Sequence, residues 1–191
     1  MNIKADSSTQ GECNNQMMIK ALFPGTFDPI HYGHLDIARR AACLFDEVVI
    51  AVYDRPMKTL IFPPEERIEL ARLAIMDDPK ISVVGYSGLT VDFCHKIGAK
   101  VIVRGLRVFS DFEYEFRMAL ANHRLAPDIE VVSLITNEEH TFLSSSTVRE
   151  IAALNGDISS MVPPHVENAL KRRLQELDES EQIVPPTSMR D

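Results

Sequence analysis

Glycine, hydroxyl-bearing and basic residues recur in short segments between apolar runs, and the first such segment could bind phosphate. It spans 24–34 (PGTFDPIHYGH), where glycines and Thr26 leave the backbone open to close approach by a ligand. His34, at the start of a helical pattern, can donate a hydrogen bond to an oxyanion beside the N–H groups of a helix N-terminus. His31 is predicted to be an ordinary polar loop residue, and a two-histidine metal site is the less favoured alternative.

Two further segments add a lysine and a cluster of hydroxyl groups. Lys58 follows the second apolar run and can reach a phosphate as a mobile point charge, although most surface lysines are merely solvated. Residues 144–147 (SSST) open a helical pattern after the fifth apolar run, so their hydroxyl and N–H groups together could cradle a phosphate. A single hydroxyl suffices for an N-cap, and capping and ligand binding are compatible.

Two arginines flank a glycine directly after the fourth apolar run. Arg104 and Arg107 each offer bidentate donors to phosphate oxygens and cannot lose their charge. The alternative is that they form ion pairs with Asp111, Glu113 or Glu115, which follow closely in the chain. Their place at the end of a predicted strand favours anion binding.

Strand and helix patterns alternate between these segments. Short β-branched runs bounded by turn residues predict strands, and apolar residues at helical spacing predict helices. The alternation predicts an α/β fold, a Rossmann-like, doubly wound, five-stranded parallel sheet with helices on both faces and a C-terminal helix. The predicted strands are 19–23, 47–53, 81–86, 101–104 and 129–134, and the predicted helices are 34–45, 63–76, 90–97, 110–125, one that begins within 144–147 and ends before 156, and 163–177.

Parallel sheets of this kind bind ligands beyond the carboxyl ends of their strands, and all four segments follow a predicted strand. They bring histidine, lysine, arginine and hydroxyl groups to one edge, without a nucleophile–base–orienter arrangement or a pair of catalytic carboxylates. The expected site is therefore a cationic cleft that holds and neutralises polyphosphate. Nucleotidyl or phosphoryl transfer by positioning and electrostatics fits such a site.

The chain has 191 residues, of which 45% are apolar and 25% charged, so it is long enough for one well-packed domain. We expect a disordered leader or added extension over 1–18, a single domain over 19–177 and a flexible tail over 178–191. The net charge of −8 argues against nucleic-acid binding, and no apolar run is long enough to span a membrane. Three distant cysteines without a C-x-x-C pair suit a reducing cytoplasm.

Three motifs in order resemble those of a known enzyme family. Thr26-Phe27-Asp28-Pro29 with Gly33-His34 is similar to the (H/T)-x-G-H signature of the nucleotidyltransferase superfamily, and Ser144-Ser145-Ser146-x-x-Arg149 is similar to its second signature. Arg104-Gly105-Leu106-Arg107 followed by Asp111-Phe112-Glu113-Tyr114-Glu115 more narrowly resembles the bacterial phosphopantetheine adenylyltransferases. The likeness runs from about Lys20 to Leu174 and leaves out the tails.

The resemblance implies that ATP and 4′-phosphopantetheine react to give dephospho-coenzyme A and pyrophosphate in a homohexamer. Mg²⁺ would be bound mainly through the ATP phosphates, with no metal-ligating protein residue. The catalytic residues would be His34, Lys58 and Arg107. Thr26, Lys58, Thr90 and Arg104 would line the phosphopantetheine side, although Thr90 stands where such enzymes commonly have an apolar residue. ATP would contact Thr26, Phe27, His34, Gly105, Leu106, Arg107, Glu115, His140, Thr141, Phe142, Leu143, Ser144, Ser145 and Ser146.

Three other functions remain open at this point. A sibling enzyme on the same scaffold, such as a nicotinate mononucleotide adenylyltransferase, is disfavoured by the block 104–115. A non-catalytic nucleotide or coenzyme A sensor is disfavoured because it has no need for the transition-state charges of His34, Lys58 and Arg107. A tRNA-interacting module is more distant, because the acidic balance opposes it.

Overall fold

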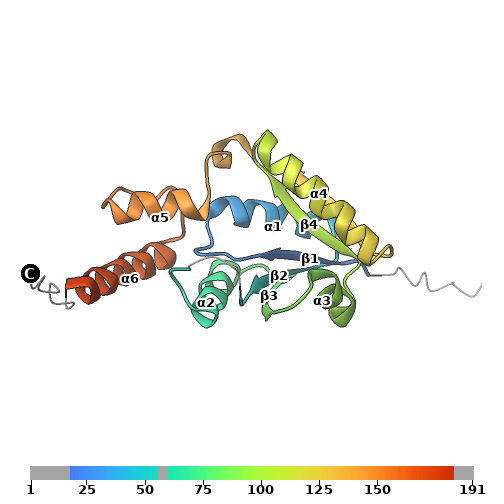
Figure 1. The fold of residues 1–191 in the computed structure, drawn as a ribbon, viewed down its shortest axis with the longest axis horizontal. Coiled ribbons are helices and arrows are strands. Elements are labelled where there is room, and N and C mark those ends of the chain that lie inside the picture. The colour runs from blue at the N-terminus through green and yellow to red at the C-terminus, as the bar shows by residue number, and fades with distance from the viewer. Residues whose placement is uncertain (1–17, 56–59, 183–191) are drawn as a thin grey trace, which may run out of the picture.

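A computed structural model describes residues 18–55 and 60–182, and most of the predicted leader and most of the predicted tail fall outside these ranges. Within them, five parallel strands form one sheet (Figure 1). The strands are β1 (Lys20–Gly25), β2 (Glu47–Tyr53), β3 (Ile81–Tyr86), β4 (Val101–Leu106) and β5 (Glu130–Ile135). Their order, β3-β2-β1-β4-β5, confirms the predicted doubly wound, Rossmann-like sheet.

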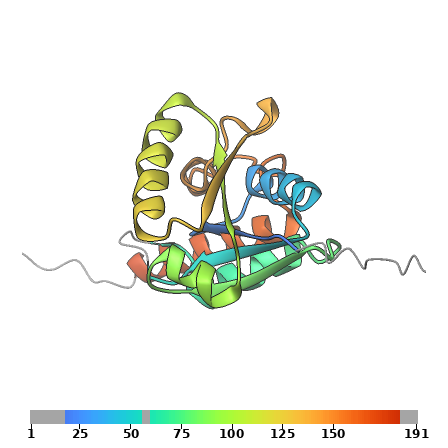
Figure 2. The same ribbon diagram turned by 90° about the vertical axis from the view of Figure 1, so that its right-hand side faces the viewer.

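Helices cover both faces of this sheet. They are α1 (Tyr32–Leu44), α2 (Pro64–Ala74), α3 (Thr90–Ile97), α4 (Phe109–Leu125), α5 (Ser145–Ala153) and α6 (Pro164–Gln182), with a short 3-10 turn at Glu138–His140. Alternate strand residues face two separate cores: α1, α2, α5 and α6 pack around Phe23 and Val103 on one face, and α3 packs around Leu22 and Ile102 on the other. Figure 2 shows α1 and α4 on opposite sides of β4 and β5.

Local signals explain where several helices begin and end. Pro64 opens α2 directly after Pro63, with Glu65 and Glu66 in the first turn, where carboxylates suit the helix dipole. Gly98 ends α3 in the left-handed region with a φ of 71°, which a glycine adopts without steric penalty. Because such signals act within a few residues, the predicted bounds of α3 agree with the structure at both ends.

Two elements that carry site residues differ from the prediction. α1 begins at Tyr32 rather than at His34, because the extended N-cap residue is His31. β4 does not end at Arg104 but runs on to Leu106, which still pairs with a residue of β5. His34 is therefore inside the first turn of its helix, and Arg104 lies within a strand.

α6 extends the predicted terminal helix. The prediction ends this helix at about Leu177, whereas the structure continues it to Gln182. No proline or glycine interrupts the chain before Pro185, and ion pairs one turn apart, such as Lys171 with Glu167 at 2.6 Å, support the helix. Neither α6 nor any other helix within the described ranges is long and apolar enough to cross a membrane.

The sheet opens between β1 and β4. The other neighbouring strands pair over six residue pairs each, whereas β1 and β4 pair only at Ala21–Val101 and Leu22–Ile102. Beyond these pairs the carboxyl-terminal halves of the two strands no longer bond to each other, at the point where the strand order reverses. Open parallel sheets bind ligands at such a switch point, so a site is expected here.

Candidate active site

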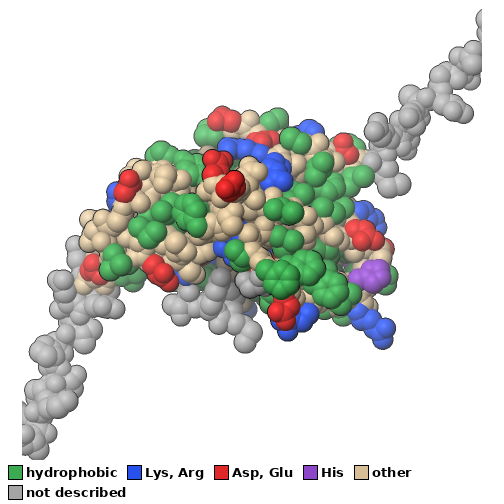
Figure 3. Space-filling model, turned by 90° about the horizontal axis from the view of Figure 1, so that it is seen from above, with side chains coloured by type: hydrophobic (Ala, Val, Ile, Leu, Met, Phe, Trp, Pro, Cys, Tyr) green, Lys and Arg blue, Asp and Glu red, His purple; other side chains and the backbone are tan. Residues whose placement is uncertain are grey.

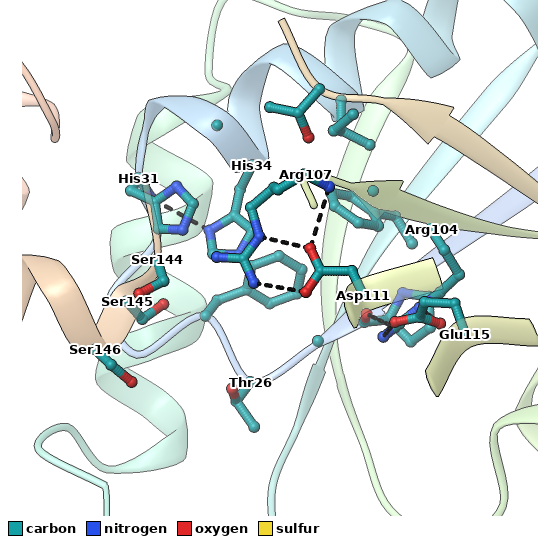
Figure 4. A pocket seen from close by; sticks show the side chains of 18 residues that line it. Thr26, His31, His34, Arg104, Arg107, Asp111, Glu115, Ser144, Ser145 and Ser146 are labelled. Atoms are coloured by element: carbon teal, nitrogen blue, oxygen red, sulfur yellow. Dashed lines mark hydrogen bonds and ion pairs between the residues drawn. The ribbon is translucent and has the colours of Figure 1, made fainter. Parts of the chain in front are cut away.

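A cavity of about 330 Å³ lies at this switch point, and segments far apart in the chain surround it (Figure 4). The ends of β1 and β4, the first turns of α4, and the N-termini of α1 and α5 contribute to its wall. The residues predicted for the site that line this cavity are Thr26, Phe27, His34, Arg104, Gly105, Arg107, Glu115, Ser144, Ser145 and Ser146.

His34 lies in the first turn of α1, and its ring is held from two sides. Its Nδ1 accepts a hydrogen bond from the backbone N–H of His31 at 3.3 Å, and the two imidazole rings stack with 3.6 Å between centroids. The ring of Phe27 meets it edge-on at 4.9 Å. Because Nδ1 is an acceptor, the neutral ring carries its proton on Nε2, so His34 can donate from Nε2.

His31 is not the ordinary loop residue that the sequence predicts. It is the N-cap residue of α1, only 4% exposed, and it lines the cavity. Burial, followed by the positive charges of Arg107 and His140, lowers the pKa of His31 to about 3, so the ring is neutral at physiological pH. The stack on His34 explains this burial, and a Cβ at Gly33 would come within 3.2 Å of the His31 ring.

Arg104 and Arg107 pair with carboxylates of α4, which is the alternative that the sequence left open. Nε of Arg104 donates to Glu115 at 2.7 Å, and Nε of Arg107 donates to Asp111 at 3.0 Å. Both pairs are bidentate, because Nη2 of each arginine donates to the second oxygen of its carboxylate. Both arginines also line the cavity, so the ion pairs do not exclude anion binding.

A third hydrogen bond ties each guanidinium to another wall of the cavity. Nη1 of Arg104 donates to the carbonyl of Pro24 in β1 at 2.8 Å, and Nη1 of Arg107 donates to the carbonyl of Leu143, just before α5, at 2.7 Å. The end of β4 is thereby linked to β1 and to the approach to α5. The two arginines hold the site together as well as lining it.

Among the described residues, the formal charges of the arginines and carboxylates that line the cavity cancel, so this part of the expected cationic cleft carries no net charge from them. Arg104 and Arg107 are each matched by a carboxylate, and the buried His31 is neutral. The attraction for anions that remains comes from the N-termini of α1 and α5, whose first residues line the cavity. Lys58, the other predicted cation, lies outside the described residues.

The serine run at the N-terminus of α5 combines structural contacts with a place in the cavity wall. Ser144 caps the helix, since its Oγ accepts a hydrogen bond from the Thr147 N–H at 3.0 Å. Ser145 donates to the carbonyl of Pro29 at 2.9 Å and ties α5 to the loop after β1. Ser146 is the exposed member of the run. All three line the cavity, so capping and a site role coexist.

Two buried charged residues hold the loop after β1 from behind. Asp28 is fully buried and accepts hydrogen bonds from the Phe62 N–H at 3.0 Å and from the guanidinium of Arg149. Arg67 of α2, equally buried, donates to the carbonyl of Thr26 at 2.7 Å. Neither residue lines the cavity, so both position Thr26 rather than contact a ligand.

A second cavity, of about 500 Å³, adjoins the first between α4 and the ends of the neighbouring strands. The two cavities share residues that include Thr26, Arg104 and Glu115. Thr90 lines the second cavity, and its hydroxyl oxygen lies 3.1 Å from that of Tyr86. A threonine at this position therefore gives the buried Tyr86 hydroxyl a hydrogen-bond partner.

Five described residues that were predicted to contact ATP line neither cavity. Leu143 is fully buried, Phe142 is 57% exposed, and His140 borders a hollow beside α1. Leu106 is the last residue of β4, and Thr141 follows the 3-10 turn. Leu143 acts through its backbone, whose carbonyl fixes an arginine of the site.

Residues without a predicted site role also line the first cavity, among them Asp111, Ile37 and Thr136. Asp111 lies four residues after Arg107 and was considered only as an ion-pair partner. Ile37 follows His34 by one helical turn, and Thr136 directly follows β5. Helical spacing for the first two and the position after a strand for the third are signals that could have found them.

Comparisons with known proteins agree on one family. A family model described as cytidylyltransferase-like matches residues 22–151. Curated proteins named phosphopantetheine adenylyltransferase are 53% identical over 155 residues in Roseiflexus sp. (strain RS-1) and 50% identical over 163 residues in Herpetosiphon aurantiacus. These alignments cover 81% and 85% of this chain, and 97% and 99% of the two relatives.

A solved structure shows the same fold at lower identity. The protein is from Vibrio parahaemolyticus and is provisionally named a nicotinate-nucleotide adenylyltransferase. It matches with a TM-score of 0.62 and 20% identity, over 81% of this chain and 99% of that one, and this likeness concerns the fold alone. From the family match and the curated relatives, the chain belongs to the cytidylyltransferase-like family of nucleotidyltransferases and, within it, to the phosphopantetheine adenylyltransferases.

Proposed function

We propose that this protein transfers the adenylyl group of ATP to 4′-phosphopantetheine, forming dephospho-coenzyme A and pyrophosphate. The observation that carries the proposal is the meeting of two cavities at Thr26, Arg104 and Glu115. The first cavity has a histidine and two helix N-termini in its wall, which suit a triphosphate. The second is larger and includes Leu89 and Met118 in its wall, which suit the long acceptor chain.

The reaction needs no general base, because the attacking phosphate oxygen of the acceptor is already an anion. This oxygen forms a bond to the α-phosphorus of ATP, and the bond from that phosphorus to the bridging oxygen of pyrophosphate breaks. The barrier lies in bringing two anions together in line. Fixed geometry and directed hydrogen-bond donors therefore supply most of the catalysis. The wall of the first cavity contains such donors.

We assign roles to the site residues by their positions. His34 stabilises the transition state from Nε2, and Arg104, which lines both cavities, orients the acceptor phosphate. Arg107 holds the ATP phosphates together with Ser145 and Ser146 of the first turn of α5. Thr26 lies between the two substrates, and Thr90 lines the acceptor side. The resemblance adds Lys58 to the charged groups and adds Phe27, Gly105, Leu106, Glu115 and the residues 140–143 to the ATP contacts.

We propose that Mg²⁺ accompanies ATP. Among residues 18–55 and 60–182, no three histidine, cysteine or carboxylate side chains form a group that could hold a metal ion. The cavity carboxylates Asp111 and Glu115 are both engaged by arginines, so the ATP phosphates are the better oxygen ligands for Mg²⁺ in this site. Bound to them, the ion would reduce the negative charge that the acceptor must approach.

We further propose that the protein works in the cytoplasm as a homohexamer, as the resemblance implies. An aromatic row on α4 supports self-association: the rings of Phe109, Phe112 and Phe116 follow one another with centroids 6.2 Å and 5.9 Å apart. Figure 3 shows hydrophobic side chains gathered on the side of the molecule where α4 lies. Exposed apolar patches of this kind mark interaction surfaces.

Pyrophosphate release from ATP in the presence of 4′-phosphopantetheine, with and without Mg²⁺, tests the proposed reaction. We expect turnover that requires both substrates, with dephospho-coenzyme A detected by mass spectrometry. Nicotinate mononucleotide is the matched control acceptor. Turnover with this control alone would assign the sibling activity, and ATP binding without turnover on either acceptor would favour a sensor.

A further inference from the structure

We infer that Asp111 is a positioning residue for adenylyl transfer: it fixes the guanidinium of Arg107 in the direction that ATP needs, and it weakens ATP binding in doing so. The inference rests on the proposed function. Asp111 lines the first cavity from the first turn of α4, and neither the resemblance nor the comparisons give it a role.

Asp111 accepts three hydrogen bonds from Arg107. Its Oδ2 accepts from Nε at 3.0 Å and from the backbone N–H at 3.1 Å, while Oδ1 accepts from Nη2 at 3.2 Å. Contacts to the backbone and to the head of the same side chain fix torsions that an unheld arginine would sample. Figure 4 shows the paired groups beside His34.

The held guanidinium still has donors for a ligand. A guanidinium carries five N–H groups. Asp111 takes two of them and the carbonyl of Leu143 takes a third, so two remain among the hydrogen bonds of the described residues. Because Arg107 is bound on more than one side, these two groups have a defined direction. They can meet a phosphate oxygen without breaking the contact to Asp111.

The same carboxylate lowers the attraction of the site for anions. Burial by itself would raise the pKa of Asp111, but hydrogen bonds from the Arg107 side chain and backbone outweigh it and lower the pKa overall. The group is therefore ionised at neutral pH. A phosphate bound to Arg107 would lie close to this negative charge, and the two would repel each other in a partly desolvated cavity.

A neighbouring carboxylate of α4 offers a matched control. Glu113 pairs with Arg117 at 3.3 Å, and both side chains are 69% exposed. The pair has the same spacing of four residues as Arg107 and Asp111, yet Glu113 lines neither cavity. Replacing Glu113 thus removes one negative charge and one ion pair from the same helix without touching the site.

Three variants are compared with the wild type: Asp111→Ala, Asp111→Asn and Glu113→Ala. Pyrophosphate release gives kcat, calorimetry without acceptor gives the Kd of ATP, and thermal melting monitors the fold. For Asp111→Ala we expect kcat to fall about tenfold, because Arg107 loses its direction. The Kd of ATP should fall about threefold, because the repulsion is gone. Asp111→Asn keeps an acceptor oxygen without the charge, so it should recover part of kcat and retain the tighter binding.

Slower turnover together with tighter ATP binding, that is, a lower kcat and a lower Kd, is the signature of positioning. An unchanged kcat in folded Asp111→Ala would overturn the inference, and so would a raised kcat, which would make Asp111 a competitor of ATP. If Asp111→Ala bound ATP no more tightly than the wild type, the claim that Asp111 repels ATP would be wrong. Glu113→Ala should match the wild type in both quantities. A wild type without turnover would refute the proposed function, whereas the calorimetry would still decide whether Asp111 opposes ATP binding.

Discussion

Two histidines at the start of α1 differ in chemistry because their surroundings differ. The ring of His31 is buried and neutral, and its backbone N–H is bonded to Nδ1 of His34. The ring of His34 lines the cavity and is held by that hydrogen bond and by the stacked ring. The first histidine thus sets the tautomer and the plane of the second, which we propose as the donor to the substrate.

His34→Ala removes the donor that we expect to act on the charge developing in the transition state. The value of kcat should fall by roughly 10²–10³-fold, the scale of losing one oxyanion-hole donor, and ATP affinity should change less. Pyrophosphate release and ATP calorimetry measure the two effects. The control is His95→Ala on α3, where His95 pairs with Asp128 on the surface. Turnover of His34→Ala close to that of the wild type would contradict the assigned role.

The neutral His31 makes the stability of the fold depend on pH. Its pKa is about 3 in the folded protein, against an ordinary value of 6.5 for histidine, so the unfolded chain binds an extra proton between these two pH values. Above about pH 6.5 the ring is neutral in both states, so its burial costs little stability. On acidification to about pH 5, the burial of the neutral ring should lower the free energy of unfolding by about 2 kcal/mol.

Urea unfolding of the wild type and of His31→Thr, at pH values between about 5 and 7, measures this contribution. The wild type should lose stability more steeply on acidification than the variant, in which no imidazole is buried. The charges that face the His31 ring are those of Arg107 and His140, which oppose its protonation. Equal slopes for the two proteins would show that His31 is protonated as easily in the fold as outside it.

At the scale of the element, the N-terminus of α5 separates folding from binding within one serine run. The Oγ of Ser144 accepts the capping hydrogen bond from the Thr147 N–H, and Ser146 is exposed at the cavity. Ser144→Ala should lower the free energy of unfolding by about 1 kcal/mol, because the Thr147 N–H loses its acceptor. Ser146→Ala should change it by less than about 0.5 kcal/mol but weaken ATP binding.

Urea unfolding and ATP calorimetry on the same two variants test this division. If Ser144→Ala were as stable as the wild type, its hydroxyl would not be the effective cap. If Ser146→Ala bound ATP like the wild type, Ser146 would be removed from the phosphate contacts. The pair of variants thus serves as its own control, since each serine is expected to move only one of the two measurements strongly.

The elements that the sequence predicts best are those with strong local signals. β2 and β3 agree with the structure at both ends, since each is an apolar, β-branched run. β4 was predicted too short because Arg104 interrupts its apolar pattern, whereas pairing with β5 carries the strand on to Leu106. Pairing partners are set by the whole sheet, and a pattern within one segment does not contain them.

The sequence predicts where the site lies but not which residues contact one another within it. The carboxyl ends of parallel strands share one edge, so segments that follow the strands had to come together. Which carboxylate reaches Arg104 depends on how α4 lies against β4, and the sequence left Asp111, Glu113 and Glu115 equally open. The burial of His31 likewise depends on packing between elements.

At the scale of the whole molecule, α4 stands out because it is left uncovered. None of its side chains that the structure describes is buried, although the other long helices contribute to the two cores. Tyr114 and Met118 line the second cavity on one side, and Phe109, Phe112 and Phe116 form the outward row, with Phe109 85% exposed. Since one side of α4 faces the second cavity, we propose that the apolar row on its outer side contacts another chain.

The double variant Phe112→Ser with Phe116→Ser should therefore weaken self-association. We expect the wild type to have the mass of six chains in light scattering coupled to size exclusion. Burial of a phenylalanine contributes about 1.5–3 kcal/mol, so losing two such contacts should raise the dissociation constant of that interface at least about a hundredfold. Leu154→Ser, which removes an apolar side chain that is 84% exposed at the end of α5, is the control and should keep the wild-type mass. A monomeric wild type, or a double variant that assembles as well as the control, would mean that the row on α4 is not an interface between copies of this chain.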